Sequence, residues 1–303
     1  MLQITRYQPK LLPSLTRLVN AHIALVPPCW TLTDAQVQAV IASAGKLWSA
    51  RFPDEDETRV YDAFVVEGDR VRAAAQWITY NDYAILLWIF AEPGADGALA
   101  ALLEAIVQQA QGLSAVNTNS RFAFGVGWFG IPPVWAHLFK GMARAGFEVT
   151  ERWVIMHAPT ADVPVSAPPA GLTLDCREDA EGDWHVTAQA DAAEVGLCEA
   201  WEIPPHFAAC DGFDRWITVE WVGVADGSRG RGIGRWLLSE QMRFQRARGF
   251  EQVMVWTETD NAAAQRMNRA LGFVNGPECW TLHRPLRDAP ANLSDNEAKG
   301  ERR

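Results

Sequence analysis

An almost continuous apolar run, Trp216–Val224, leads directly into a short loop that holds three glycines and two arginines. A run that is apolar on both faces is typical of a strand buried inside a sheet. After the loop, Ile233, Trp236 and Leu237 recur at helical spacing, which predicts an amphipathic helix ending near Gly249. The chain should therefore contain a strand, a glycine loop and a helix in direct succession.

This order favours a phosphate site. Glycines allow main-chain N–H groups to approach an anion without a Cβ in the way, and the start of a helix adds partial positive charge. Two arginines add full charges in a chain whose formal net charge is −10. The loop residues that we expect to hold a phosphate are Arg229, Gly230, Arg231, Gly232, Ile233 and Gly234.

Three known phosphate loops compete for this stretch. A Walker A loop needs Gly-Lys-Ser/Thr, which does not occur, and a dinucleotide fingerprint would need glycine where Arg235 stands. The stretch instead reads Arg-x-x-Gly-x-Gly. After the next predicted strand comes Asn261-x-x-Ala264-x-x-Met267, and Gly272-Phe273 follows after four intervening residues.

The first half of the chain repeats the predicted order of elements in weaker form. Strand-like segments at 71–79 and 84–90 precede a helical segment at 99–111, and 122–128 is again strand-like. A predicted helix then ends at Gly146-Phe147, 126 residues before Gly272-Phe273. An internal duplication is the simplest explanation.

Together the two motifs resemble the GNAT superfamily of N-acetyltransferases, strongly over 216–273 and reasonably over 172–286. The resemblance and the duplication imply an α/β (α+β) chain of two tandem GNAT-like domains. Each would have a mixed, mostly antiparallel central sheet flanked by helices. We expect a degenerate domain at 1–157, a proline-rich linker at 158–170, a complete domain at 171–287 and a disordered tail at 288–303.

The resemblance implies that acetyl-CoA lies between the fourth and fifth strands of the second domain. Main-chain groups of Val222 and Val224 would pair with pantetheine, the loop would hold the pyrophosphate, and Asn261 would contact the cofactor. An N–H near Val224 would face the thioester oxygen. A strand edge opened by a bulge presents such N–H groups.

Transfer to an amine needs a base, and Glu220 within the apolar strand is the leading candidate. Strand alternation predicts that Glu220 shares a face with Thr218 and Val222. A structural Glu paired with an arginine is the competing explanation. His206 and Glu202 are second choices, and each could equally be a loop residue.

The sequence departs from the family at the position of the general acid. The family's tyrosine position is occupied by Asn268, which can form hydrogen bonds but cannot protonate a leaving group at neutral pH. All four tyrosines lie in the first half, so either water protonates the departing thiolate, or Tyr80 or Tyr83 reaches across, or the domain binds CoA without turnover. The second domain also lacks room for the two helices that form the family's acceptor wall. The first half, or a second subunit in a homodimer, would have to supply it.

The first copy has lost the phosphate loop. Glu92 and Asp96 replace its arginines, Pro93 removes an N–H group, and Trp135 stands at the position of Asn261. We therefore expect this half to shape the structure or the substrate site and not to bind CoA; binding of a ligand other than CoA is the alternative.

Composition limits the partners and the compartment. The negative charge argues against nucleic acid and suits a neutral or cationic substrate, although solubility alone would explain it. Five widely spaced cysteines predict free buried thiols, no metal site and a reducing compartment. With no leader or membrane-length apolar run, a cytoplasmic protein is expected.

The sequence thus predicts an acyltransferase, an acetyl-CoA-dependent N-acetyltransferase acting on a small amine-bearing acceptor. A non-catalytic acyl-CoA-binding or regulatory protein of the same fold is the alternative, motivated by Asn268 and the short acceptor wall. A protein-interaction module that uses the degenerate half is a third.

Overall fold

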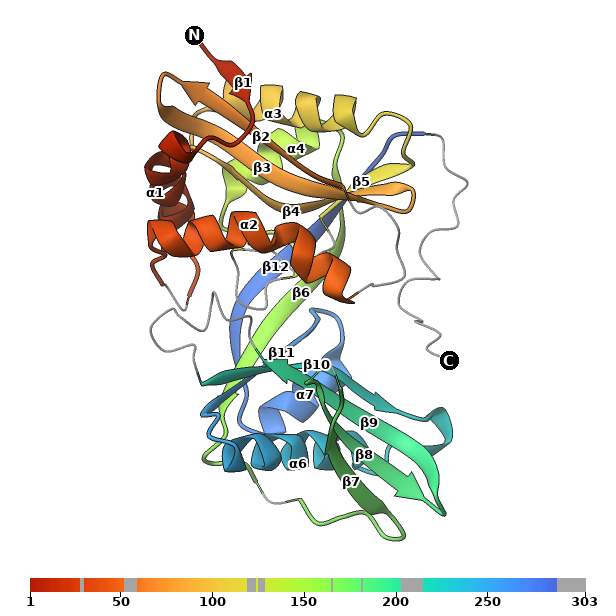
Figure 1. Ribbon diagram of the computed structural model, residues 1–303. Helices are drawn as coiled ribbons and strands as arrows, with labels where there is room; N and C mark the ends of the chain where they lie inside the picture. The colour runs from red at the N-terminus through yellow and green to blue at the C-terminus, as the bar shows by residue number, and fades with distance from the viewer. Residues whose placement is uncertain are drawn as a thin grey trace.

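The computed structural model describes residues 1–27, 30–51, 59–118, 124, 129–164, 166–180, 182–202 and 215–287. Its twelve strands form one sheet in the order β1-β2-β3-β4-β5-β12-β6-β11-β10-β9-β8-β7 (Figure 1). In the first half the elements are β1 (Gln3–Thr5), η1 (Pro9–Leu11), α1 (Leu12–Ile23), α2 (Asp34–Arg51), β2 (Arg59–Glu67), β3 (Arg70–Tyr80), β4 (Tyr83–Ala91), α3 (Asp96–Gln109), β5 (Ala115–Asn117), α4 (Ala136–Arg144) and β6 (Glu148–Pro159). In the second half they are β7 (Thr173–Glu178), β8 (Trp184–Ala190), β9 (Ala193–Glu202), β10 (Trp216–Val224), η2 (Asp226–Ser228), α6 (Ile233–Ala247), β11 (Gln252–Glu258), α7 (Ala262–Ala270) and β12 (Val274–Pro285).

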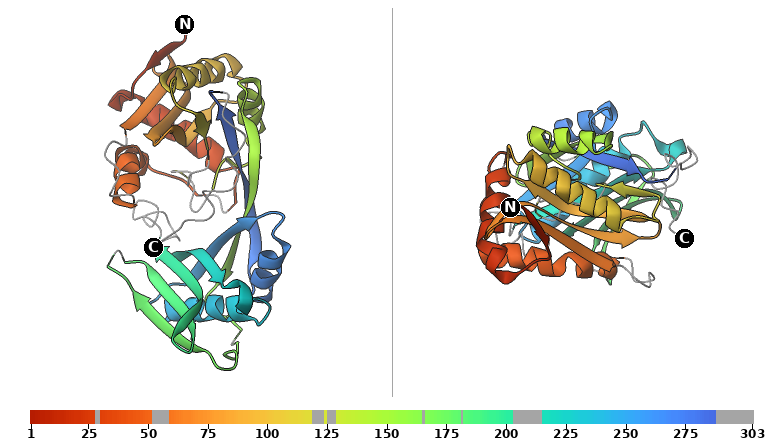
Figure 2. Two further views of the ribbon diagram at one scale, coloured as in Figure 1. Left: turned by 90° about the vertical axis from the view of Figure 1, so that its right-hand side faces the viewer. Right: turned by 90° about the horizontal axis from the view of Figure 1, so that it is seen from above.

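The two halves exchange their last strands. Strand β6 belongs to the first half by sequence, yet its outer edge pairs with β11, from Pro159↔Gln252 to Trp153↔Glu258. Strand β12 ends the second half, yet it pairs with β5 of the first. The two long strands also pair with each other in antiparallel orientation and run between the halves in both side views (Figures 1 and 2). Each half therefore completes its sheet with a strand of the other.

Alternation along β6 divides its side chains between two hydrophobic cores. Val154 and Met156 enter the core of the second half, whereas Ile155 enters the core of the first. Leu282 of β12 is also buried in the first core, 2% exposed. Trp216, at the start of β10, packs against this first core as well. One face of β6 and the start of β10 therefore pack against the core of the first half.

Helices α6 and α7 cover one face of the sheet in the second half, because buried residues of α6 and the residues after α7 share a core with β8 to β11. Gly196 on β9 permits the close approach: a Cβ there would lie 2.9 Å from Leu237 Cδ1 and 3.3 Å from Ile233 Cγ2. No helix occurs in the described residues between β7 and β8. This agrees with the prediction that the second domain lacks room for the two helices of the acceptor wall.

The tandem order of elements is confirmed. Gly146 follows α4 with φ 82° and Gly272 follows α7 with φ 90°, so the two copies end these helices in the same left-handed way. Strand β10 has the predicted limits. The segment 122–128 lies outside the described residues apart from residue 124, and the strand between α3 and α4 is instead β5. Strand β6 runs through Pro159, two residues into the predicted linker.

Candidate active site

Strands β10 and β11 pair over only part of their length. Their parallel register runs from Trp216↔Gln252 to Val219↔Val255 and goes no further, although β10 continues to Val224 and β11 to Glu258. Beyond this point β10 pairs with β9 and β11 pairs with β6. Within the described residues, β11 therefore does not pair with 221–224, and the main chain along that edge can bond a ligand.

The expected bulge lies at the start of this edge. The β10–β9 register shifts between Val219↔Ala200 and Trp221↔Glu199, which leaves Glu220 as the extra residue. The predicted alternation across this point is wrong, because Thr218 lies opposite Trp201 and Val222 opposite Cys198, which face opposite sides of β9. An inserted residue inverts the pleat. Glu220, which is half-buried, is the residue at which the alternation of side chains along β10 reverses.

The glycine loop adopts a conformation suited to an anion. Gly230 and Gly232 have φ of 78° and 80°, which L side chains rarely adopt. Gly232 is the N-cap of α6 and no side chain caps the helix. The first-turn amides of α6 have no acceptor within the helix, and they carry its positive dipole end.

Both loop arginines are exposed. The Arg229 guanidinium lies 2.8 Å from Asp226 Oδ1 and donates to the Val224 carbonyl at 3.2 Å, which ties the loop to the end of β10. Arg231 donates to the Ala170 carbonyl at 3.4 Å. Exposed pairs of this kind contribute at most about 1 kcal/mol. The guanidinium groups can therefore turn toward an anionic ligand at little cost.

Gly234 marks where the loop, β10 and α7 meet. A Cβ there would lie 3.3 Å from Met267 Sδ, 3.6 Å from Val224 Cγ2 and 3.7 Å from Val222 Cγ1. The predicted loop and strand residues are thus brought together at one place. Asn261 caps α7, because its Oδ1 accepts from the Ala264 amide at 3.1 Å. Its contact with a cofactor stays a prediction.

Asn268 on α7 is 3% exposed, and its Nδ2 donates to Met156 Sδ at 3.6 Å. Its Oδ1 is buried with no hydrogen-bond partner among the described residues. A buried acceptor left unpaired costs about 1–3 kcal/mol. His206 lies outside the described residues, as does the side chain of Tyr80. Glu202, the last described residue of β9, is exposed, and Tyr83 packs against the first core.

Sequence reasoning missed two side chains on the face of β10 opposite α6. Thr218 is fully buried, and its Oγ1 has no hydrogen-bond partner in the described part of the chain. Trp221 is 52% exposed and lies over Gly223, where a Cβ would come within 2.4 Å of the indole Nε1. The bulge decides which face of β10 carries these two side chains, and the apolar composition of the strand does not predict a bulge.

Cys198 and Cys279 are buried free thiols, as expected, and burial raises the pKa of both. Cys176 is exposed instead, because β7 is the edge strand of the sheet, and Cys29 and Cys210 lie outside the described residues. No group of three or more metal-ligating side chains occurs in the described ranges. None of the helices in those ranges is both long and apolar enough to cross a membrane.

The chain is similar to proteins of one family. The model described as "Acetyltransferase (GNAT) family" matches residues 151–273. Mycothiol acetyltransferase from Thermobispora bispora is 39% identical over 189 residues, which cover 49% of this chain and 63% of that protein, somewhat under two thirds of its length.

Two solved structures share the fold along nearly the whole chain. A GCN5-related N-acetyltransferase from Sphaerobacter thermophilus matches with a TM-score of 0.63 at 15% identity, over 95% of this chain and 97% of that one. A tandem GNAT protein from the clavulanic acid biosynthesis pathway matches with a TM-score of 0.62 at 14% identity, over 96% and 100%.

Proposed function

We propose that this chain, which is similar to the GNAT acetyltransferases over residues 151–273 and shares the fold of tandem GNAT structures, transfers an acetyl group from acetyl-CoA to the amine of a small molecule. One observation carries the proposal. No strand of the described residues pairs with the β11-facing edge of 221–224, which lies beside a glycine loop that opens a helix without a side-chain cap. A peptide-like arm can pair with the first, and a pyrophosphate with the second.

The residues present fit acetyl-CoA. Amides from Arg229 to Gly234 would hold the pyrophosphate, and main-chain groups of Val222 and Val224 would pair with pantetheine. Acetyl-CoA, when bound, supplies the acetyl group as an activated thioester. A preorganised N–H near Val224 would stabilise the oxyanion, an effect worth roughly 3–4 kcal/mol.

Glu220 would accept the proton of the attacking amine, with Glu202 and His206 as second choices. Its place at the bulge, between the paired and unpaired parts of β10, supports this role. Asn268, at the family's tyrosine position, would hydrogen-bond the departing sulfur.

The first half would serve as the acceptor wall, since its core extends to Trp216 on β10. Domain limits at 1–157, 158–170 and 171–287, a reducing cytoplasmic compartment and a homodimer are parts of the same proposal. Two buried free thiols support the compartment.

Release of free thiol from acetyl-CoA, measured with a panel of small amines, tests the proposal. The panel should include the substrate of mycothiol acetyltransferase, given the similarity over 189 residues. Amine-dependent thiol release above the amine-free rate is expected. CoA binding without turnover on any amine would instead favour a non-catalytic acyl-CoA-binding protein, the second candidate, which the replacement of the family's tyrosine by Asn268 supports.

A further inference from the structure

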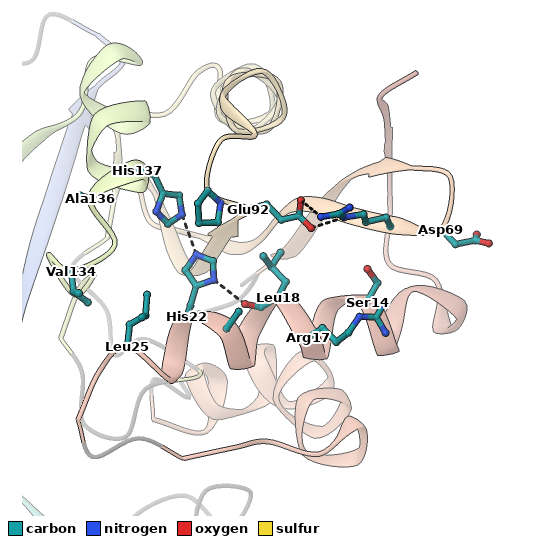
Figure 3. Close-up of a pocket in the computed structure, with 13 residues that line it drawn as sticks. Ser14, Arg17, Leu18, His22, Leu25, Asp69, Glu92, Val134, Ala136 and His137 are labelled. Carbon is teal, nitrogen blue, oxygen red and sulfur yellow. Dashed lines mark hydrogen bonds and ion pairs between the residues drawn. The ribbon is translucent and has the colours of Figure 1, made fainter.

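The first half contains a cavity of about 720 Å³ at the end of β4, bounded by α1 and the start of α4 (Figure 3). It lies where the first copy should have its phosphate loop, because Glu92 and Pro93 follow β4 as the loop follows β10. Its volume is in the range of small-molecule sites. Nothing in the proposed acetyl transfer uses this cavity.

Two histidines at the cavity have a defined hydrogen-bond arrangement. His22 Nδ1 lies 2.8 Å from the Leu18 carbonyl, which can only accept, so Nδ1 carries the hydrogen. His22 Nε2 is then an acceptor, and it lies 3.1 Å from His137 Nε2. His137 Nε2 is also 2.8 Å from the Ala91 carbonyl, so it must donate toward both acceptors.

This chain of bonds fixes the tautomer of His137. Its Nδ1 is left as the acceptor of the neutral ring. Burial lowers the pKa of His22 to about 4, so His22 stays neutral near pH 7 and keeps the arrangement. The Trp135 indole donates to the His22 carbonyl at 2.9 Å and holds the end of α1 in place. The cavity therefore offers a preorganised acceptor for an N–H or O–H group.

The charges at the cavity leave one cation uncompensated. Glu92 is held by Arg70 at 2.7 Å and Arg72 at 3.0 Å, and Asp69 by Lys10 at 3.1 Å. Arg17 lines the same cavity from α1, and no ion pair involves it in the described part of the chain. An anionic group is the complementary ligand.

The remaining wall is apolar and partly open to solvent. Leu25 and Val134 line the cavity and are 53% and 52% exposed, whereas Leu18, which also lines it, is buried. In Figure 3, Leu25 and Val134 lie on the same side of the cavity, near His22. Large apolar side chains exposed around a hollow favour a ligand with an apolar body.

We propose that this cavity binds a small amphipathic anion, with its acidic group at Arg17, its apolar body over Leu25 and Val134, and an N–H or O–H donating to His137. The site is distinct from the acetyl-CoA site. Pro93 has no N–H group, and the ion-paired Glu92 occupies the position where loop amides would hold a pyrophosphate.

Two fluorescent probes that differ in one group test the proposal on the full chain. 8-Anilinonaphthalene-1-sulfonate has an anion, an apolar body and an N–H group, and N-phenyl-1-naphthylamine lacks only the sulfonate. Arg17→Ala should weaken sulfonate binding about tenfold and leave the neutral probe unchanged. His137→Phe and the cavity-filling Ala21→Trp should weaken both.

Lys140→Ala is the matched control, because Lys140 is an exposed cation outside the cavity, and it should change neither probe. Arg17 and Ala21 are both exposed, so their variants should keep the wild-type Tm. Equal sulfonate affinity in Arg17→Ala, or unchanged binding in Ala21→Trp, overturns the proposal. So does displacement of the probe by CoA, which would put it in the acetyl-CoA site. None of these results depends on whether the protein transfers acetyl groups.

Discussion

Val219 of β10 and Val255 of β11 are the last paired residues of two parallel strands that both continue beyond them. The residue after Val219 is the bulged Glu220, so the strands part where β10 also changes its pairing with β9. One local irregularity thus opens a main-chain edge and sets a carboxylate at its inner end. The chemistry that we propose depends on this coincidence.

Reversing the charge of the glycine loop should abolish CoA binding. In Arg229→Glu/Gly232→Asp, two carboxylates replace a cation and an N-cap glycine, so CoA affinity should fall at least 100-fold. Calorimetric titration with CoA measures it. Arg243→Glu/Gly249→Asp is a matched control, because it makes the same changes at the middle and the far end of α6, including a glycine with φ 95°. Equal affinities of the two double variants would refute the loop assignment.

Glu220→Gln should lower turnover about 100-fold or more while CoA affinity stays within twofold, because the amide fills the same space but cannot accept the proton. Rates of thiol release across pH, with CoA titrations in parallel, separate these effects. The control is Glu194→Gln on β9, an exposed position away from the bulge. A wild-type rate in Glu220→Gln would exclude Glu220 as the base.

Asn268→Leu should fold with equal or greater stability but lose turnover, because the change removes a buried acceptor that lacks a partner in the described residues. Gln265→Leu on the same helix is the contrast. The Gln265 amide donates to the carbonyls of Glu258 and Thr259, so its loss should cost about 1–3 kcal/mol. Urea unfolding measures both. A larger loss for Asn268→Leu than for Gln265→Leu would show that Asn268 has a structural role.

Stability should fall as the pH drops from about 6.5 to 4. The folded state keeps His22 neutral because burial lowers its pKa to about 4, whereas the unfolded imidazole binds a proton below its ordinary pKa of about 6.5. The contribution of neutral His22 to the free energy of unfolding is complete above pH 6.5. At pH 4 it is smaller by about 3 kcal/mol.

Urea unfolding at pH 7 and pH 4.5 checks this linkage. The loss between the two pH values should be smaller in His22→Gln than in the wild type. His157 and His283, whose pKa values burial also lowers, contribute equally to both proteins. An identical loss in the two proteins would remove His22 as a source of the pH dependence.

Leu282→Ala should destabilise the first half by about 2–5 kcal/mol, although the residue belongs to the last strand of the chain, because its side chain is buried in the first core. Hydrogen exchange should then quicken in β3 and β4. Val253→Ala, buried in the second core, should quicken exchange around β8 to β10 instead. Loosening of the second half alone by Leu282→Ala would contradict the exchange of strands.

The second copy was predictable because its signals are local. The apolar run of β10, the Asn261 cap and the glycines after α6 and α7 each follow from a few neighbouring residues. The order of elements and the family resemblance depend on these signals, and the fold bears them out. Simple alternation failed at Glu220, because a bulge depends on how β9 pairs with β10.

By itself the sequence determined the elements of the second half, the duplication and the glycine loop at the start of α6, since propensities, caps and glycine conformations act over a few residues. The tertiary structure alone decided which strands pair. Backbone hydrogen bonds are the same for every residue, so nothing local could tell β6 to join β11 or β12 to join β5. The same long-range packing brought His22 and His137 together across 115 residues and gave the degenerate copy a cavity of its own.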